Sequence, residues 1–323
     1  MLKVGVFGAG HLGRIHLQQW LQIENVEVIG FYDPFDENAA KAEAMGISRF
    51  LEKEKLIAAC DAIDIASTTT THFENAELCL KNNKHLFVEK PLTNTLDEAK
   101  RLLQLIQEAG VKGQVGHVER FNPAFLSIQK RNLNPMFIEC HRLAQFNPRG
   151  ADVAVILDLM IHDIDIILSI VKSSVKKISD SGVAIVSDTF DIANARLEFD
   201  NGCVANITAS RISLKKMRKM RLFQPDAYIG IDFLEKKTEV CRISTTAEND
   251  DWAIPVELGN DRQKFIHFEA PKTDENNAIK MELEYFRDSI LNDTETKISF
   301  LDGYKAMLIG YQILDEIERN NPI

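Results

Sequence analysis

The sequence predicts an α/β fold with a second, α+β domain. In the first third, short apolar runs alternate with helical patterns, whereas the second half contains successive strand-like runs. Alternation builds βαβ units and a doubly wound, mainly parallel sheet, while consecutive strands favour a large, mainly antiparallel open sheet. A chain of 323 residues also exceeds one typical core. We therefore expect two domains, residues 1–120 and 121–323.

The strands expected in the first domain are almost continuously apolar, which fits burial on both faces of a parallel sheet. They are 3–9, 26–33, 47–50, 62–67, 85–89 and 112–119. The helical patterns between them are 11–23, 36–45, 52–59, 71–82 and 95–110. The last pattern ends on Gly110, a residue common just after helix C-termini.

The second domain has a different order of elements. It is expected to contain, in turn, a helix at 122–133, a strand at 136–146, a helix at 158–171, strands from about 175 to 270, and helices near 275–292 and 301–318. The Asn201-Gly202 step between two of the strands favours a tight hairpin turn. This order predicts helices packed on a mostly antiparallel sheet.

The composition excludes several classes of protein. The formal net charge of −10 argues against a general nucleic-acid binder, which needs a basic surface. No apolar run reaches the roughly 18 residues of a membrane span, and the first residues lack the layout of a signal peptide. The five cysteines are scattered without C-x-x-C spacing, so we expect no metal site and a cytoplasmic protein.

A glycine-rich loop follows the first expected strand. In VFGAGHLGRIH, Gly8, Gly10 and Gly13 have the G-x-G-x-x-G spacing and open the first helix. Such glycines permit a tight turn, close approach of a pyrophosphate, and close packing of helix on strand. The loop, including His11 and Leu12, is therefore expected to hold a dinucleotide at the helix N-terminus.

The second strand ends on Asp33, 20 residues after Gly13. A carboxylate at this place accepts hydrogen bonds from the adenosine ribose and repels a 2′-phosphate. The next residue is Pro34 rather than an arginine that would attract this phosphate. The sequence therefore favours NAD(H) over NADP(H).

Polar residues also follow the later strands, at the edge where ligands bind in open α/β sheets. Ser67, Thr68 and His72 come after the strand at 62–67 and are candidates for cofactor contacts. One hydroxyl of this stretch is alternatively a cap for the next helix. In VEKPL, Pro91 restricts Lys90 to extended geometry at a strand tip. Both Lys90 and Glu89 are candidates for the cofactor site, where Glu89 is expected to help position the lysine or the cofactor. An isolated Glu-Lys-Pro is more simply solvated, but beside a dinucleotide loop Lys90 is a candidate proton donor and acceptor.

The stretches GAGHLGRIH, ASTTTTHFENA, VEKPL and DLMIHDID together resemble the glucose–fructose oxidoreductase/inositol dehydrogenase (Gfo/Idh/MocA) family over essentially the whole chain. The resemblance implies an N-terminal Rossmann domain and a C-terminal open sheet that makes oligomer contacts, here a homodimer or homotetramer. It also implies nicotinamide-dependent oxidation or reduction at a carbon of a sugar, cyclitol or related compound.

The family's catalytic residues correspond to Lys90, Asp158 and His162. Independently, residues four apart share a helix face, so Asp158 and His162 are able to address one substrate. The alternative is that His162 and its acidic neighbours form an ordinary polar helix face. One departure is RGADVAVILDL before this helix, where many members have glycines. It indicates a distinct subgroup.

The stretches GQVGHVERFNPAF and TASRISLKKMRKMRLFQ are similar to a subgroup of nucleotide-sugar oxidoreductases that includes the UDP-N-acetylglucosamine 3-dehydrogenases. This resemblance makes five residues substrate-binding candidates: Glu119, Arg120, Asn122, Arg211 and Lys215. Glu119 and Arg120 alternatively form an interdomain salt bridge, and the basic segment at 214–222 is alternatively a solvated edge strand.

The predicted function is hydride transfer between NAD and a sugar carbon, with the 3-position of a UDP-N-acetylamino sugar as the expected site. Two alternatives stay open. One keeps the chemistry and takes a free sugar, cyclitol or biliverdin-like substrate. The other is an NAD-binding regulator without catalysis, against which the presence of Lys90, Asp158 and His162 together argues.

Overall fold

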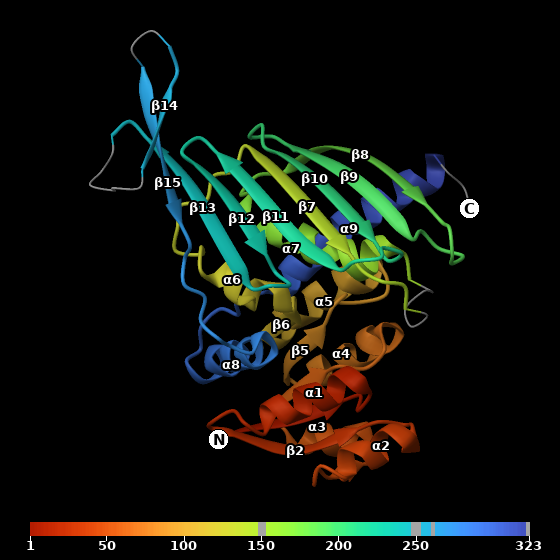
Figure 1. The fold of residues 1–323 in the computed structure, drawn as a ribbon. Helices are drawn as coiled ribbons and strands as arrows, with labels where there is room; N and C mark the ends of the chain where they lie inside the picture. Colours follow the sequence, from red (N-terminus) through yellow and green to blue (C-terminus); the bar gives the residue numbers. More distant parts are fainter. Residues whose placement is uncertain (148–152, 247–252, 260–261, 321–323) are drawn as a thin grey trace. The chain divides into compact units, whose positions relative to one another are not determined.

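The computed structural model describes residues 1–147, 153–246, 253–259 and 262–320. These residues form two compact units (Figure 1). The first comprises Met1–Val118 together with Asn277–Leu308, and the second comprises the described residues of Glu119–Asn276 and those from Ile309 onward. The long C-terminal helix α9 (Phe300–Asn320) contributes residues to both units.

The first unit contains a six-stranded parallel sheet in the order β3-β2-β1-β4-β5-β6. Its strands are β1 (Leu2–Phe7), β2 (Val26–Tyr32), β3 (Arg49–Phe50), β4 (Ala62–Ile65), β5 (His85–Glu89) and β6 (Gly113–Gly116). The strand order reverses between β1 and β4. The carboxyl ends of these two strands therefore border the crevice where ligands bind in open α/β sheets.

The helices between these strands confirm the alternation that the sequence predicts. They are α1 (His11–Trp20), α2 (Asp36–Glu43), α3 (Lys53–Ala59), α4 (His72–Lys81) and α5 (Leu96–Ala109). Helix α5 begins with a capping box, because the Thr95 side chain accepts from the Glu98 N–H while the Glu98 carboxylate accepts from the Thr95 N–H. It ends at Gly110, whose φ of 64° is the left-handed conformation expected there.

Helix α8 (Ala278–Leu291) belongs to the first unit, whereas the predicted domain division assigned all residues after 120 to the second domain. Its Leu283 and Phe286 are fully buried in the hydrophobic cluster of the first unit. The Arg287 guanidinium donates to the Glu24 carbonyl at 2.9 Å, and Asn277 donates to the Gln19 side chain at 3.0 Å. The apolar face of an amphipathic helix is buried wherever it meets an apolar surface, whatever the order of elements in the chain. Residues 277–308 belong to the first unit.

The second unit contains a nine-stranded sheet in the order β14-β15-β13-β12-β11-β7-β10-β9-β8. The strands are β7 (Phe137–Leu143), β8 (Val175–Val183), β9 (Ile192–Phe199), β10 (Val204–Ser210), β11 (Met217–Gln224), β12 (Ala227–Asp232), β13 (Lys237–Ser244), β14 (Ile254–Glu257) and β15 (Gln263–Glu269). All neighbouring pairs are antiparallel except β7 with β10. The predicted large, mainly antiparallel sheet is therefore confirmed.

One face of this sheet is buried, since every second residue of β9 and β10, such as Ala195, Leu197 and Ile207, is buried. Figure 1 shows α7 (Ile161–Ile170) and the C-terminal part of α9 on one side of the strands. A methyl group added at Gly182 of β8 would lie 2.9 Å from Ile317 of α9, so that helix packs closely on the sheet.

Two helices of this unit differ from their predicted ranges. Helix α6 is limited to Pro123–Leu126 and is followed by turns, rather than extending over 122–133. The predicted helix at 158–171 begins earlier, with a π-helical turn at Ile156–Met160 that leads into α7. π-Helical turns within helices are rare and frequently occur at functional sites.

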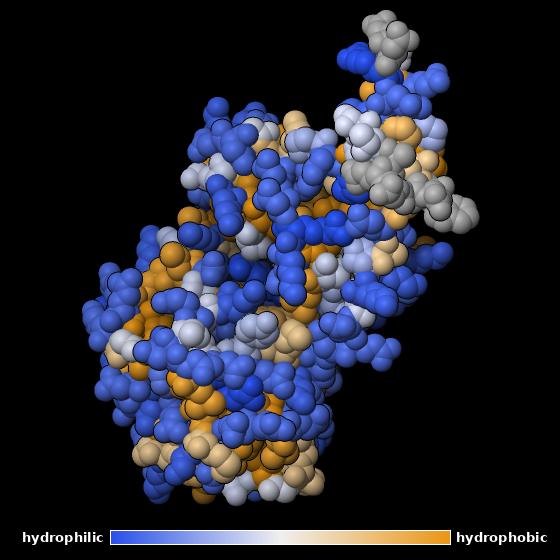
Figure 2. All heavy atoms as spheres, turned by 90° about the vertical axis from the view of Figure 1, so that its left-hand side faces the viewer, coloured by the Kyte–Doolittle hydropathy of each residue, from blue (hydrophilic) through white to orange (hydrophobic). Residues whose placement is uncertain are grey.

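Within the described ranges, no helix is long and apolar enough to cross a membrane. The molecular face in Figure 2 is mainly hydrophilic, with smaller hydrophobic patches between polar residues. Scattered patches of this kind are normal on protein surfaces.

Candidate active site

The glycine loop has the geometry that a dinucleotide requires. Gly8 has a φ of +91°, and a Cβ there would lie 2.7 Å from the Ser67 Cα. A Cβ at Gly13 would lie 1.9 Å from the Gly8 carbonyl oxygen, so α1 and β1 approach too closely for any side chain. A Cβ at Gly10, in contrast, would meet no atom within 4 Å. Gly10 therefore leaves open space beside the backbone, which suits the predicted approach of a pyrophosphate.

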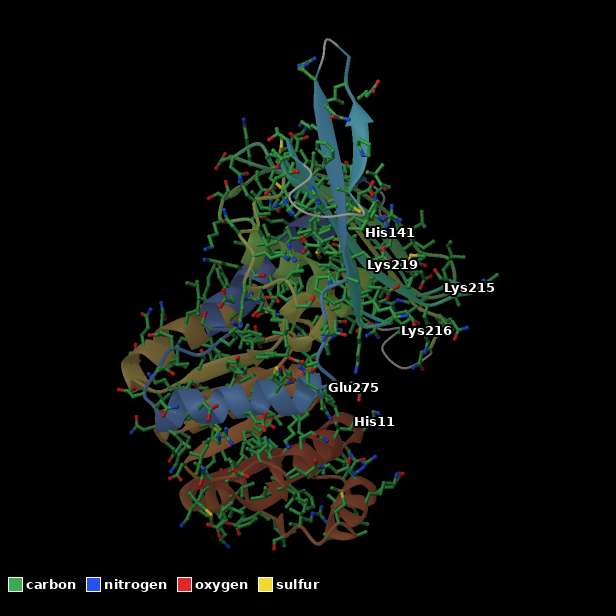
Figure 3. The ribbon with its side chains drawn as sticks, turned by 60° about the vertical axis from the view of Figure 1, so that its left-hand side comes forward. His11, His141, Lys215, Lys216, Lys219 and Glu275 are labelled. Atoms are coloured by element: carbon green, nitrogen blue, oxygen red, sulfur yellow. The ribbon has the colours of Figure 1, made fainter. Side chains whose placement is uncertain are left out.

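The N-terminus of α1 has no side chain that caps it. Gly10 is the N-cap residue and offers no acceptor to the first N–H groups of the helix. These N–H groups and the helix dipole provide a site for an anion such as a pyrophosphate. His11, the first residue of the helix, is exposed at this end (Figure 3).

Asp33 lies just beyond β2 and is 4% exposed. Its Oδ2 accepts from the Ala9 N–H at 2.7 Å, and its Oδ1 accepts from the Phe35 N–H at 2.8 Å. Asn38 also donates to Oδ2, at 3.3 Å. A carboxylate has about four lone-pair sites, so Asp33 retains capacity for a ribose hydroxyl. Its link to Ala9 also ties the glycine loop to the second strand.

A cavity of about 360 Å³ lies at this edge of the sheet. It is lined by seven of the predicted cofactor residues: Gly8, Gly10, His11, Leu12, Asp33, Ser67 and Thr68. Nine further lining residues are not among the predicted cofactor residues: Phe7, Tyr32, Pro34, Phe35, Asn38, Lys53, Ala66, Thr71 and Asn75. An apolar wall with a few polar groups and an N–H anion site fits the adenosine and pyrophosphate of a dinucleotide.

The strand tip after β4 is held by its own side chains. The Ser67 hydroxyl lies 2.7 Å from that of Thr71, and the Asn75 amide donates to Ser67 at 3.2 Å. His72 is 1% exposed, with Nδ1 2.9 Å from the Pro91 carbonyl and Nε2 3.1 Å from the Ser67 carbonyl. Burial is the main cause that lowers the pKa of His72. His72 thus links two strand tips and does not line the cavity, and its contact with the cofactor stays a prediction.

Lys90 follows β5, and its peptide bond to Pro91 is cis. Cis peptide bonds occur almost exclusively before proline. The side chain is partly buried. The Lys90 backbone N–H donates to the Glu89 carboxylate at 3.1 Å. Glu89 therefore accepts from the backbone that carries the candidate catalytic lysine.

A buried charged cluster lies behind this tip. His16 of α1 has Nδ1 2.9 Å from Asp64 and Nε2 3.1 Å from Glu89. Trp20 also donates to Asp64, at 2.7 Å. Burial disfavours the charged imidazole, but Asp64 and Glu89 outweigh it and raise the pKa of His16 well above its ordinary value. Sequence analysis missed His16, although it lies in the quoted GRIH stretch.

In the second unit, Asp158 lies in the π-helical turn and His162 in the first turn of α7. Both are partly buried. The two further acidic residues of α7 have structural partners. Asp163 accepts two hydrogen bonds from Arg142, each 2.9 Å, and Asp165 accepts two from Arg120, at 2.7 and 2.6 Å. These pairs give Asp163 and Asp165 structural tasks, and the catalytic tasks of Asp158 and His162 stay predictions.

Glu119 and Arg120 belong to buried ion pairs within the second unit, rather than to an interdomain bridge. Glu119 is 5% exposed and accepts from Arg142 at 2.8 Å and from Asn122 at 3.0 Å. Asn122 also caps α6 and donates to the Phe233 carbonyl at 3.0 Å. Burial opposes the charge of Arg142, but Asp163 and Glu119 outweigh it and raise the pKa of the guanidinium. These contacts hold the segment after β6; substrate contacts by Glu119, Arg120 and Asn122 stay predictions.

The two basic candidates differ from each other. Arg211 is 5% exposed, donates to the Val153 carbonyl, and has Nε 3.9 Å from Asp191. Lys215 is exposed in the segment before β11, near Lys216, and extends outward (Figure 3). Lys215 is therefore accessible to an anion, whereas Arg211 already has polar partners.

Comparison with known proteins extends these observations. Residues 2–117 match the oxidoreductase family with an NAD-binding Rossmann fold, and residues 104–225 match the GFO/IDH/MocA C-terminal domain. The UDP-N-acetylglucosamine 3-dehydrogenase of Acidithiobacillus ferrooxidans is 36% identical over 241 residues, 74% of this chain and 76% of that protein. A solved structure of this dehydrogenase from that organism has a TM-score of 0.88 at 31% identity and covers 98% of each chain.

A second relative has a different substrate. The scyllo-inositol 2-dehydrogenase (NAD(+)) of Bacillus subtilis is 28% identical over 233 residues, 66% of this chain and 68% of the relative. These relatives are dehydrogenases that act on CH–OH groups. Together with the Rossmann unit and the nine-stranded sheet, they confirm the predicted resemblance, and the chain belongs to the Gfo/Idh/MocA family of oxidoreductases.

Proposed function

We propose that this oxidoreductase uses NAD to oxidise the 3-hydroxyl of a UDP-N-acetylamino sugar, with UDP-N-acetylglucosamine as the first candidate. The observation that carries the proposal is the similarity to UDP-N-acetylglucosamine 3-dehydrogenase, which extends over 98% of both chains. Lys90, Asp158 and His162 supply the polar groups that oxidation of a hydroxyl requires.

Each of these residues has a distinct task in the proposed mechanism. The Lys90 ammonium donates a hydrogen bond to the reacting hydroxyl oxygen and holds it in place. The neutral His162 imidazole accepts the hydroxyl proton as the carbon becomes a carbonyl. Asp158 hydrogen-bonds the sugar or orients the imidazole. Acceptance of hydride from the substrate carbon is the chemistry that the nicotinamide supplies when it is bound.

The preference for NAD rests on Asp33. Its buried carboxylate has room for a ribose hydroxyl and would repel a 2′-phosphate. Lys53 also lines the cavity, and its positive charge would attract a 2′-phosphate. However, its ammonium already interacts with Glu74, at 3.4 Å, and with the Tyr32 ring, whose centre is 5.5 Å away. We expect NADP to bind more weakly than NAD, and expect D33A to narrow the difference. Fluorescence titration of both cofactors measures it; equal affinities in the wild type would contradict this preference.

A free cyclitol is the second candidate substrate. The 28% identity to scyllo-inositol 2-dehydrogenase over 66% of this chain favours it. The two candidates differ in charge, because only the nucleotide sugar carries a diphosphate. For a diphosphate, the exposed Lys215 is the proposed contact, and Arg211 has a supporting role through its carbonyl and carboxylate partners.

The test is to mix the protein with NAD and a panel of UDP-sugars and free cyclitols, and to follow absorbance of the reduced cofactor. We expect turnover with UDP-N-acetylglucosamine and a raised KM in K215A. K90A should lose at least about 100-fold in kcat, the usual contribution of a proton-transfer group, yet retain NAD binding. The control is K100A, which alters an exposed lysine of α5. Turnover with cyclitols alone would favour the second candidate, and full activity of K90A would refute the mechanism.

The oligomer is proposed to form through the nine-stranded sheet, as a homodimer or homotetramer in the cytoplasm. The sheet supports this proposal because residues such as Arg196 and Glu198 of β9 are accessible on the face opposite the buried one, where another copy could contact them. Light scattering after gel filtration measures the mass; a monomer at micromolar concentration would contradict the proposal.

A further inference from the structure

Glu282 of helix α8 is a fully buried carboxyl group with no assigned task in the proposed mechanism. Its exposed fraction is 0%, and neither carboxyl oxygen has a hydrogen-bond partner among the described residues. An isolated ionised carboxylate in such surroundings is strongly disfavoured, because it has lost water without gaining a partner. A cation or a proton must therefore compensate its charge.

The groups that face Glu282 come from four elements of the first unit. One ring nitrogen of His16 of α1 and one carboxyl oxygen each from Glu282 and from Glu89, at the end of β5, all lie within 4.8 Å of one another. Asp64 of β4 adds a second carboxylate beside His16. Gln114 of β6 donates a hydrogen bond from its Nε2 to the Glu282 main-chain carbonyl at 2.8 Å. This last bond ties the α8 backbone at Glu282 to β6.

The hydrogen bonds of the cluster decide where the negative charges lie. His16 contacts both Asp64 and Glu89, and Glu89 also accepts from the Lys90 N–H. Burial raises the pKa of Glu89, but His16 and Lys90 outweigh it and lower that pKa. Glu282 has no such donors, and burial together with the neighbouring Glu89 raises its pKa well above the ordinary value. Two close carboxyl groups that share a site do not both ionise readily.

We propose that Glu282 is held as a neutral carboxylic acid beside the Glu89 carboxylate, and that this pair holds the strand tip that carries Lys90. Glu282 is thus a positioning residue. Its O–H lies close enough to donate toward Glu89, and Glu89 in turn accepts from the Lys90 backbone N–H. The protonation of Glu282 stands on the cluster alone, whereas its effect on turnover rests on the proposed function.

The proton is tested first, without any activity measurement. The infrared C=O stretch of a protonated carboxylic acid is resolved from that of a carboxylate. We expect this band in the wild type at neutral pH and its loss in E282Q, whose amide keeps the shape and a donor. The matched control is E284Q, which alters a partly exposed glutamate of the same helix. A band that survives in E282Q, or that is absent from the wild type, would overturn the proposal.

Stability gives a second measurement of the same proton. A raised pKa means that the folded chain keeps a proton that the unfolded chain releases above about pH 4.5, so stability falls as pH rises toward the folded pKa. Relative to E282Q, the unfolding constant of the wild type should rise about tenfold per pH unit in this window. His16 also has a raised pKa, but it is present in both proteins. An identical pH dependence in both, or a dependence that a chelator abolishes, would refute protonation, the latter because a metal ion would occupy the cluster.

The positioning role is tested with E282L, which removes the donor but keeps a comparable volume. We expect E282L to lose about tenfold in kcat with an unchanged KM for NAD, and E282Q to restore most of kcat. If E282L folds poorly, the comparison of E282Q with the wild type in the infrared and unfolding measurements still decides protonation. Wild-type kcat in folded E282L would overturn the positioning role. Full activity of K90A would instead refute the proposed mechanism and leave the infrared result intact.

Discussion

The Arg120–Asp165 pair offers a quantitative test, because sequence analysis and structure give Arg120 different tasks. The guanidinium donates two hydrogen bonds to one carboxylate, at 2.7 and 2.6 Å, and the two side chains are 10% and 1% exposed. Removal of one partner from such a pair leaves a buried charge and typically costs about 3–5 kcal/mol. We therefore expect R120M and D165L each to lose about this much unfolding free energy.

The double variant R120M/D165L replaces both charges by apolar groups. Because such replacements are often nearly neutral, we expect it to be more stable than either single variant, with a coupling energy of about 2–4 kcal/mol. Urea unfolding followed by far-UV circular dichroism measures all four proteins. The control is R196M, which breaks a pair that is 42% and 37% exposed and should cost less than about 1 kcal/mol. Losses below about 1 kcal/mol in R120M would refute the structural role.

The same variants distinguish a substrate contact from a structural one. If Arg120 acts only through Asp165, the double variant should regain a wild-type KM for the sugar together with its stability. A restored stability with a KM that stays raised would return Arg120 to the substrate site, as the sequence predicts.

Three further predictions follow from other parts of the molecule. G13A should abolish detectable NAD binding, because the added Cβ would lie 1.9 Å from the Gly8 carbonyl oxygen; micromolar affinity in a calorimetric titration would contradict this geometry. Asp191 is buried, which disfavours its charge, but hydrogen bonds from Ser187 and nearby backbone N–H groups outweigh burial and lower its pKa to about 2. The ionised Asp191 therefore stabilises the fold above its ordinary pKa, and this stabilisation is lost as pH falls toward 2. D191N should lose about 1.5–3 kcal/mol of unfolding free energy at neutral pH, and its stability should vary less with pH in acid; urea unfolding measures both. Of the five thiols, only Cys241 is not buried, so we expect one fast-reacting thiol in the native protein and five after unfolding, counted with a chromogenic disulfide reagent.

Local sequence patterns predicted residues 1–118 of the first unit well, because their strands, helices and glycine loop depend mainly on residues close in the chain. The spacing of Gly8, Gly10 and Gly13 dictates a turn and a close approach that the structure shows atom by atom. The same holds for Asp33, whose carboxylate meets the Ala9 N–H as the end of the second strand lies beside the first. The alternation of strands and helices also follows from periodicity within short windows.

Features that depend on distant residues escaped prediction. Glu282 is 193 positions after Glu89, and neither periodicity nor a motif indicates that α8 returns to the first unit. His16 was overlooked for a related reason, since an imidazole in a first helix acquires its meaning only from Asp64 and Glu89. Prediction from sequence therefore found seven of the residues that line the cavity and missed the buried groups behind them.

The polar residues of the π-helical turn and of α7 show why sequence alone does not separate a candidate catalytic group from a structural one. Asp158, His162, Asp163 and Asp165 lie within eight residues and look equivalent in the sequence. In the structure, Asp163 and Asp165 are nearly inaccessible, and each accepts two hydrogen bonds from one arginine. The two bidentate pairs fix the rotation of α7 about its axis, because both carboxylates must meet guanidinium groups in a defined plane. The partly buried Asp158 and His162 precede these two residues, in the π-helical turn and the first turn of α7. A helix whose rotation is fixed in this way would hold the proposed proton acceptor His162 in a defined orientation.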